Sequence, residues 1–247
     1  MKLPDKYSLV TYDPIDSTNS EAKRLCSVHN IGHLVIWGMN QTHGYGKLKQ
    51  YWESGSNNLT FSIIIPHKYQ AKLVSHFLFI AALSLYHAIN SIFKRYNINH
   101  KISLKWPNDI LIDGAKLSGI LIENLESKIH NNHMIIGIGM NITEKPEGIN
   151  SCSLSDFTED KIDMSEIMVN IVNHIESYRD KWLIKGFDNI KFEWLLHAYN
   201  IGREIVVTTP SQKIQGIFTG INSDGAMIIK LKSGLSIAIT IGEIAMN

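Results

Sequence analysis

One stretch, residues 103–123, constrains the fold more than any other part of the chain. It contains two apolar runs, one ending before Pro107 and one from Leu117 to Ile122. Pro107 fixes its own φ and removes a backbone donor, and Asp113-Gly114 is typical of a tight turn. The pattern predicts a hairpin that rigidly holds a polar insert. That insert carries Asn108, Asp109, Asp113, Gly114 and Lys116. An ordinary hairpin with a solvated lysine explains the same residues, so the flanking segments must decide.

Composition limits the class of protein. The chain has 247 residues, 44% of them hydrophobic, and a formal net charge of +1. This length supports one sizeable domain plus a small one. The near-neutral charge predicts no nucleic-acid partner, and the lack of a long apolar run predicts no membrane span. No signal peptide is evident, and two cysteines are too few for a disulfide framework, so we expect a cytoplasmic protein.

Polar and glycine-rich segments alternate with apolar runs in the first half. Thr18 is a candidate helix N-cap, with Glu21 closing a capping box. Strands are expected at residues 34–39 and 59–65. The polar stretch between them, residues 41–58, is long for a compact domain, which favours a mobile segment that covers a ligand over a passive loop.

Apolar periodicity predicts a helix over residues 71–95, with His76 and His87 at its surface or boundary. A strand follows at 133–142, where Gly137 and Gly139 indicate a bulge or close approach of a ligand or another backbone. His130 and His133 are expected at a hairpin tip. Further helices are expected from Asp163 to about residue 182 and over 188–199.

The composition changes near residue 200. Short strand-like runs then alternate with turn signals at Pro210-Ser211, Asn222 to Gly225 and Ser233-Gly234. This is typical of a small all-β barrel. We therefore predict two domains, residues 1–199 and 200–247.

The residues alone point to binding of an anion or an activated acyl group. A lysine supplies a point charge, and glycines let backbone N–H groups approach a ligand. The chain has no G-x-x-x-x-G-K-[ST] and no G-x-S-x-G, and neither cysteine has the context of a nucleophile. No metal site is expected. Spacing and composition predict no more than a nucleotide- or acyl-binding α/β domain with a β appendage.

Taken in chain order, several motifs resemble those of the biotin protein ligases, or biotin–[acetyl-CoA-carboxylase] ligases. The matching stretches are Ser17-Thr18-Asn19, Gln41-Thr42 with Gly44 and Gly46, Trp52 with Asn58-Leu59, Lys105-Trp-Pro-Asn-Asp109, Lys116 to Glu123, Gly137-Ile-Gly-Met-Asn141 and Gly242-Glu-Ile244. The family's corresponding patterns include S-T-N, Q-T-x-G-R-G-R-x-G-R-x-W, K-W-P-N-D, K-x-x-G-I-L-x-E and G-x-G-x-N. One such motif would be weak evidence, but the ordered set is specific.

The resemblance implies an α+β fold: a mixed sheet flanked by helices, of the class II synthetase-like type, followed by an SH3-like β-barrel. It implies a ligase that uses ATP and Mg²⁺ to convert biotin to biotinyl-5′-AMP. The biotin then passes to a lysine of the biotin-carboxyl-carrier domain of acetyl-CoA carboxylase. Mg²⁺ would arrive with ATP, with no metal-binding residues of the protein's own. A homodimer paired through sheet edges is compatible with the resemblance.

The family also implies roles for individual residues. Lys116 would neutralise the biotin carboxylate and the α-phosphate, and Asp109 would assist the incoming lysine or Mg²⁺. The biotin-binding residues would be Ser17, Thr18, Asn19, Gln41, Gly44, Tyr45, Lys47, Lys116 and Gly119. The nucleotide-binding residues would be Trp52, Asn108, Asn141 and Lys116.

Two departures from the family pattern qualify the expectation. The loop carries Tyr45, Lys47 and Gln50 where the family has arginines, and Lys49 replaces its last glycine. Because lysine lacks arginine's bidentate fork, we expect a looser lid and weaker retention of the adenylate. Ser17 also lies too near the start for an N-terminal helix-turn-helix domain, so a monofunctional type without operator binding is expected.

A lipoate or octanoate ligase and a biotin-binding module without turnover remain as alternatives.

Overall fold

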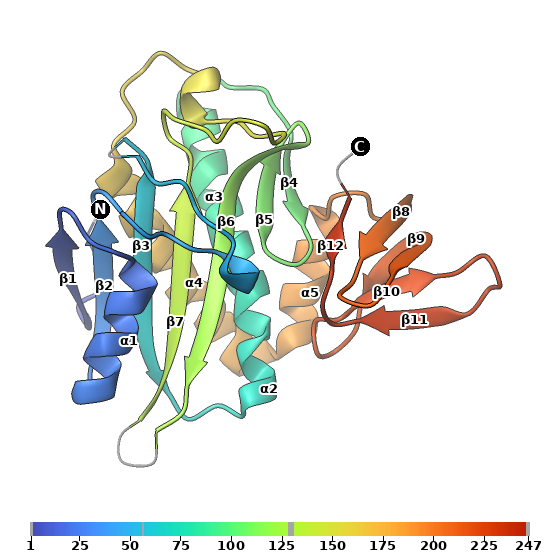
Figure 1. Ribbon diagram of the computed structural model, residues 1–247, viewed down its shortest axis with the longest axis horizontal. Helices are drawn as coiled ribbons and strands as arrows, with labels where there is room; N and C mark the ends of the chain where they lie inside the picture. Colours follow the sequence, from blue (N-terminus) through green and yellow to red (C-terminus); the bar gives the residue numbers. More distant parts are fainter. Residues whose placement is uncertain (1, 56, 128–130, 246–247) are drawn as a thin grey trace.

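The computed structural model describes residues 2–55, 57–127 and 131–245. Its larger sheet has seven strands in the order β1-β2-β3-β7-β6-β5-β4 (Figure 1). They are β1 (Tyr7–Tyr12), β2 (His33–Gly38), β3 (Leu59–His67), β4 (Ile102–Lys105), β5 (Asp109–Ile112), β6 (Ala115–Leu125) and β7 (Asn132–Met140). Only β1 and β2 pair in parallel among these, and the other pairs are antiparallel. The sheet is therefore mixed, as predicted.

Helices cover both faces of this sheet. They are α1 (Thr18–Val28), α2 (Ala71–Val74), α3 (His76–Arg95), α4 (Met164–Lys185) and α5 (Phe187–Leu196). Alternation along β3 explains the two layers: Ile63 and Ile65 join the large core beneath α3 and α4, whereas Ile64 joins a smaller cluster with Ala22 of α1. Figure 1 shows α1 on the near face and α3 and α4 behind the sheet.

The stretch from Ala71 to Arg95 is apolar and long enough to cross a membrane by composition, but most of it is buried inside this domain. Here it serves as the central core helix. The predicted single helix is interrupted at Ser75, which separates α2 from α3. His76 is 4% exposed, so its predicted position at the surface or boundary of the helix is wrong. His133 is likewise buried, within β7, whereas the prediction for His130 lies outside the described residues.

The central stretch is a three-stranded meander, and the predicted hairpin with a polar insert is wrong. Ile110, Leu111 and Ile112 form β5 and are buried, so the insert itself contributes a strand to the core. β5 pairs with both β4 and β6. As a result, Asp109 is the first residue of β5. Asp113 and Gly114 form the turn after β5, and Lys116 lies within β6 instead of at that turn.

Helix boundaries also differ from the predictions. Ser17, not Thr18, is the N-cap of α1 and accepts a hydrogen bond from the Ser20 N–H. Asp163 caps α4 as predicted, but that helix continues to Lys185. α5 spans Phe187–Leu196 and thus ends before residue 199.

The C-terminal strands form a separate five-stranded antiparallel sheet, in the order β11-β10-β9-β8-β12. They are β8 (Glu204–Thr208), β9 (Lys213–Ile221), β10 (Met227–Lys230), β11 (Ser236–Ile239) and β12 (Glu243–Ile244). The predicted division at residue 199 falls in the connection between α5 and β8 and stays a prediction. In the described residues the pairings run from β11 to β12 without closing the barrel.

The turn between β9 and β10 docks this small domain onto the larger one. The Trp106 indole N–H donates to the Gly225 carbonyl at 3.0 Å, and His76 Nε2 bonds the Ser223 carbonyl at 2.8 Å. Trp182 donates to the other ring nitrogen of His76, which fixes a neutral imidazole that donates from Nε2. The turn therefore packs directly behind Trp106, next to the predicted catalytic stretch.

Candidate functional site

A cavity of about 610 Å³ opens where α1, β5, β6, β7 and the small domain meet. This volume is typical of a small-molecule site. Every predicted site residue except Gly44 lines it, namely Ser17, Thr18, Asn19, Gln41, Tyr45, Lys47, Trp52, Asn108, Asp109, Lys116, Gly119 and Asn141. Gly44 lies behind this lining, where a Cβ atom would stand 2.7 Å from the Trp52 carbonyl oxygen.

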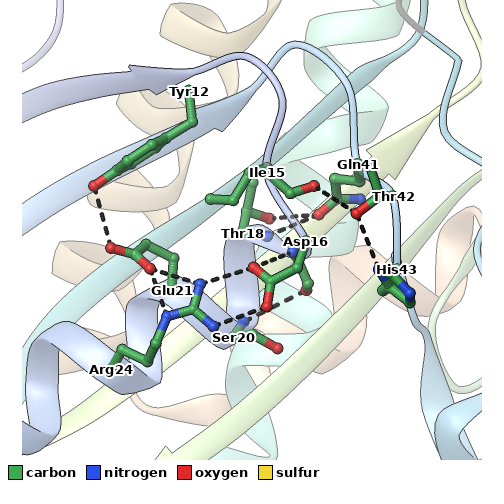
Figure 2. Close-up of polar contacts among 11 residues, drawn as sticks. Tyr12, Ile15, Asp16, Thr18, Ser20, Glu21, Arg24, Gln41, Thr42 and His43 are labelled. Carbon is green, nitrogen blue, oxygen red and sulfur yellow. Dashed lines mark hydrogen bonds and ion pairs between the residues drawn. The ribbon is translucent and has the colours of Figure 1, made fainter.

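The start of α1 forms one wall of the cavity. Thr18 donates to the Gln41 side-chain oxygen from both its backbone N–H (2.8 Å) and its hydroxyl (3.1 Å), and Gln41 donates to the Ser54 hydroxyl. Figure 2 shows the Thr18–Gln41 contact and, beside it, the Arg24 guanidinium between Asp16 and Glu21. The hydrogen bond from Arg24 lowers the pKa of Asp16 to about 2. Paired charges thus fix the turn that presents Ser17 and Thr18.

Asn19 lies deeper in the same wall. Its side-chain oxygen accepts a hydrogen bond from the Ser62 hydroxyl at 2.5 Å, and its nitrogen donates to Glu123 at 2.9 Å. A Cβ atom at Gly137 would stand 2.3 Å from this side chain. The glycine in β7 therefore makes room for the Asn19 side chain. Gly137 also lines the cavity, so of the predicted alternatives the close approach of a ligand stays a prediction.

Trp52 occupies the space above the second glycine of β7. A Cβ atom at Gly139 would stand 2.3 Å from the indole, and one at Gly119 would stand 3.1 Å from it. The Lys116 ammonium lies 5.6 Å from the ring centroid. The Trp52 ring thus packs against the glycine positions of β6 and β7 and lies within cation–π distance of the Lys116 ammonium.

Lys116 and Asp109 form the charged floor of the cavity. Lys116 Nζ lies 2.7 Å from Asp109 Oδ1, and a register shift in the β5–β6 pairing places the lysine beside Leu111. The Lys116 backbone N–H and C=O bond Asn150 and Cys152, which anchors the strand on its other side. Both charged groups therefore stand on immobilised backbone.

Lys105 does not line the cavity but contacts Asp109 from behind it, and the sequence prediction of the site did not include it. It is 3% exposed, and its Nζ lies 3.8 Å from Asp109 Oδ2. Burial lowers the pKa of Lys105, while the Asp109 carboxylate opposes that shift. One carboxylate thus faces two ammonium groups. The sequence held one sign of this contact, a lysine four residues before Asp109 at the end of the apolar strand β4.

Asn108 and Asn141 already use their amide nitrogens for the backbone. Asn108 donates to the Ile120 carbonyl at 2.8 Å, and Asn141 donates to the Cys152 carbonyl at 3.0 Å. Their side-chain oxygens have no described hydrogen bond. Asn108 keeps its second amide N–H, so it can donate to a ligand or accept from one while its backbone bond stays in place. Asn141 also donates to the Lys116 carbonyl at 3.5 Å, so its oxygen is the group it offers to a ligand.

Residues 43–53, here called the cover segment, close the cavity from the solvent side. In Figure 1 the segment runs in blue across the front of β6 and β7. Leu48 and Lys49 both have positive φ, 54° and 62°. Lys47 Nζ donates to the Gly242 carbonyl at 2.9 Å, and burial lowers the pKa of Lys47. The cover segment is therefore attached to the small domain.

Comparisons with known proteins agree with this geometry. Residues 14–141, more than half of the chain, match the biotin/lipoate A/B protein ligase family. The chain belongs to this family. Residues 201–246 match the biotin protein ligase C-terminal domain, which narrows the assignment to biotin protein ligases.

Individual relatives support the same assignment. The chain is 27% identical to a biotin–[acetyl-CoA-carboxylase] ligase of Paracoccus denitrificans, over 89% of this chain and 92% of that protein. It is 27% identical to the bifunctional ligase/repressor BirA of Bacillus subtilis, over 92% of this chain and 70% of that protein. The structure of the Aquifex aeolicus biotin protein ligase with biotin and ATP superposes with a TM-score of 0.81 at 28% identity, covering 96% and 97% of the two chains. The predicted family, fold class and ligase activity are confirmed.

Proposed function

We propose that this ligase activates biotin with ATP and transfers it to a lysine of the biotin-carboxyl-carrier domain of acetyl-CoA carboxylase. The position of Lys116 carries the proposal: its ammonium stands in a cavity of suitable size, 2.7 Å from a nearly buried carboxylate. A fixed cation at that point stabilises negative charge that develops between a carboxylate and a phosphate.

In the first step, a carboxylate oxygen of biotin attacks the α-phosphorus of ATP, and pyrophosphate leaves. Mg²⁺ would enter as the partner of ATP. Lys116 would turn from Asp109 toward the new mixed anhydride. Lys105 would then remain as the partner of Asp109, so that the carboxylate is not left buried and unpaired.

In the second step, the acceptor amine attacks the acyl carbon of biotinyl-5′-AMP, AMP leaves, and the amine loses a proton. Asp109 is the carboxylate at the cavity floor that can assist this lysine once Lys116 has moved. Trp52 and the cover segment would exclude water from the anhydride. A cytoplasmic location is part of the proposal, because two cysteines are too few for the disulfide framework typical of secreted proteins.

The test is transfer of labelled biotin to a purified carrier domain with MgATP. We expect transfer by the wild type, and a loss of about 100-fold to 1000-fold in Lys116→Ala, the range for removal of one preorganised donor. Lys191→Ala is a suitable control because that lysine lies on α5 and pairs only locally with Asp188. Biotin binding without transfer would identify a binding module, and transfer of lipoate or octanoate instead would overturn the choice of substrate.

A further inference from the structure

Tyr45 is the point at which the cover segment meets the wall of the cavity. Its hydroxyl donates to Glu123 Oε2 at 3.0 Å, a contact between residues 78 positions apart. The Lys49 ammonium lies 4.2 Å from the Tyr45 ring centroid and the Lys23 ammonium lies 5.2 Å from it. The ring therefore sits within reach of two cations while its hydroxyl bonds an anion.

Glu123 is satisfied without Tyr45. Its Oε1 pairs with Lys23 at 2.7 Å, and its Oε2 also accepts from the Asn19 amide at 2.9 Å. Burial works against the charge on Lys23, but its interactions with Glu123 and Tyr45 outweigh burial and raise the pKa of Lys23. When the tyrosine departs, the carboxylate thus keeps a cation and a donor, and no unpaired buried charge is created. Such a contact can open and close reversibly.

The cover segment depends on such contacts for its shape. Leu48 and Lys49 adopt positive φ, a conformation that costs a residue with a side chain free energy. The segment contributes only a short 3₁₀ turn, Lys47–Lys49, and an isolated bridge between Tyr45 and Tyr51. Its backbone hydrogen bonds, such as Gly46 N–H to Gln50 and Trp52 N–H to Gly44, are internal, apart from the bond of the His43 N–H to the Asp16 carbonyl at its base. Side-chain contacts therefore hold the part that lies over the cavity.

We propose that Tyr45 and Glu123 form the latch that holds the cover segment closed, with Lys23 and Lys49 supporting the ring. Both residues are positioning residues: they act by holding the segment over the ligand. The nature of the retained ligand, an acyl-adenylate, rests on the proposed function. The latch itself rests only on the contacts described above. It also revises the expectation of a loose lid, because a tyrosine supplies an anchor where the family pattern has an arginine.

The first experiment measures closure without activity. Trypsin cleaves after lysine, and Lys47 and Lys49 lie in the cover segment, so the rate of cleavage there reports opening in the full-length protein. We expect Tyr45→Phe to raise this rate several-fold. Tyr12→Phe is a matched control, because Tyr12 also donates to a glutamate, Glu21, and neither of these residues lines the cavity (Figure 2). Equal cleavage of the wild type and both variants would overturn the latch.

The second experiment measures release of the adenylate from enzyme preloaded with biotin and MgATP. We expect about 5-fold to 10-fold faster release in Tyr45→Phe, the range for net loss of a typical intramolecular hydrogen bond. Loss of the Lys49 cation in Lys49→Met should accelerate release about 2-fold to 5-fold. The melting temperature of Tyr45→Phe should stay close to that of the wild type.

A double-mutant cycle separates a latch from a general loosening. In a Glu123→Ala background, Tyr45→Phe should change release by less than about 2-fold, since the partner is already gone. Additive effects of the two substitutions would overturn the proposal. If the wild type forms no adenylate, the proposed function fails, and the trypsin comparison still decides whether the latch exists.

Discussion

Lys116 and Lys47 both line the cavity, yet they are held there in different ways. Lys116 stands on β6, between β5 and the 150–152 segment, and this part of the strand is paired on both sides. Lys47 stands in the cover segment and is held by its own side chain, through the Gly242 carbonyl. The floor of the cavity is built by the sheet, whereas the cover is built by a few side-chain contacts.

This difference assigns separate tasks to the two regions. A group that must meet a developing charge gains from a backbone that does not move. A group that must admit substrates and release the adenylate gains from contacts that break individually. Substitutions in the floor should therefore reduce chemistry or stability, and those in the cover should change release.

The largest effect is expected at Asp109. Asp109→Asn would leave Lys105, which is 3% exposed, beside a neutral amide, at a cost of about 3 kcal/mol in the free energy of unfolding. Denaturant unfolding measures this cost. Adding Lys105→Met removes the unpaired ammonium and should recover part of the loss. A double variant less stable than Asp109→Asn would contradict the pairing of Asp109 with Lys105.

Gly139→Ala should come next. The added methyl carbon would stand 2.3 Å from the Trp52 indole, so the ring must move off β7. We expect the catalytic efficiency with ATP to fall by about 10-fold, the scale of a misplaced positioning group. Gly148→Ala is a control, since nothing lies within 4 Å of a Cβ there, although its positive φ adds some strain. Unchanged kinetics for Gly139→Ala would mean that the position of Trp52 does not matter.

Lys47→Met tests the attachment of the cover to the small domain. Loss of its hydrogen bond to Gly242 should speed adenylate release about 5-fold, with little change in adenylate formation. Lys232→Met, on an 80% exposed lysine of the small domain, is the control. If adenylate formation slows while adenylate release stays constant, Lys47 acts in the chemistry as the residues of the cavity floor do. The proposed difference between the floor and the cover segment would then be wrong.

The smallest effect concerns pH. Burial lowers the pKa of His76, which accepts a hydrogen bond from Trp182 while neutral. The unfolded chain therefore binds the extra proton first, so stability falls as pH decreases below about 6.5, by at most about 1.4 kcal/mol per pH unit for this group. His76→Gln should have a melting temperature that depends less on pH between 7.5 and 5.5. An identical dependence would show that the other buried histidines account for it.

Much of the fold could be predicted from the sequence, because elements with a buried face have apolar residues at regular spacing. The strands at 34–39 and 59–65 were predicted within a few residues of β2 and β3. β5 was missed because polar neighbours on both sides masked its three apolar residues. The buried position of His76 depends on a turn near residue 223, which no local pattern reveals.

The cavity lining was largely predictable because a family resemblance marks short motifs. The contacts within it were not. Lys105 stood in a recognised motif, but only the burial of its neighbours makes it a counter-charge to Asp109. The Tyr45–Glu123 contact joins two motifs that spacing does not relate. Pairings of this kind arise from tertiary structure, so composition and periodicity carry no signal for them.

The turn behind Trp106 has a consequence for building chimaeras. A foreign C-terminal module would need a carbonyl that meets the Trp106 indole, where Gly225 now supplies one. It would also need a glycine there, since a Cβ atom at position 225 would stand 2.6 Å from Phe79. A module exchanged without that turn would leave a buried indole N–H unpaired. The contact that must be conserved between the two modules therefore lies at the turn between β9 and β10, not at the linker that joins them.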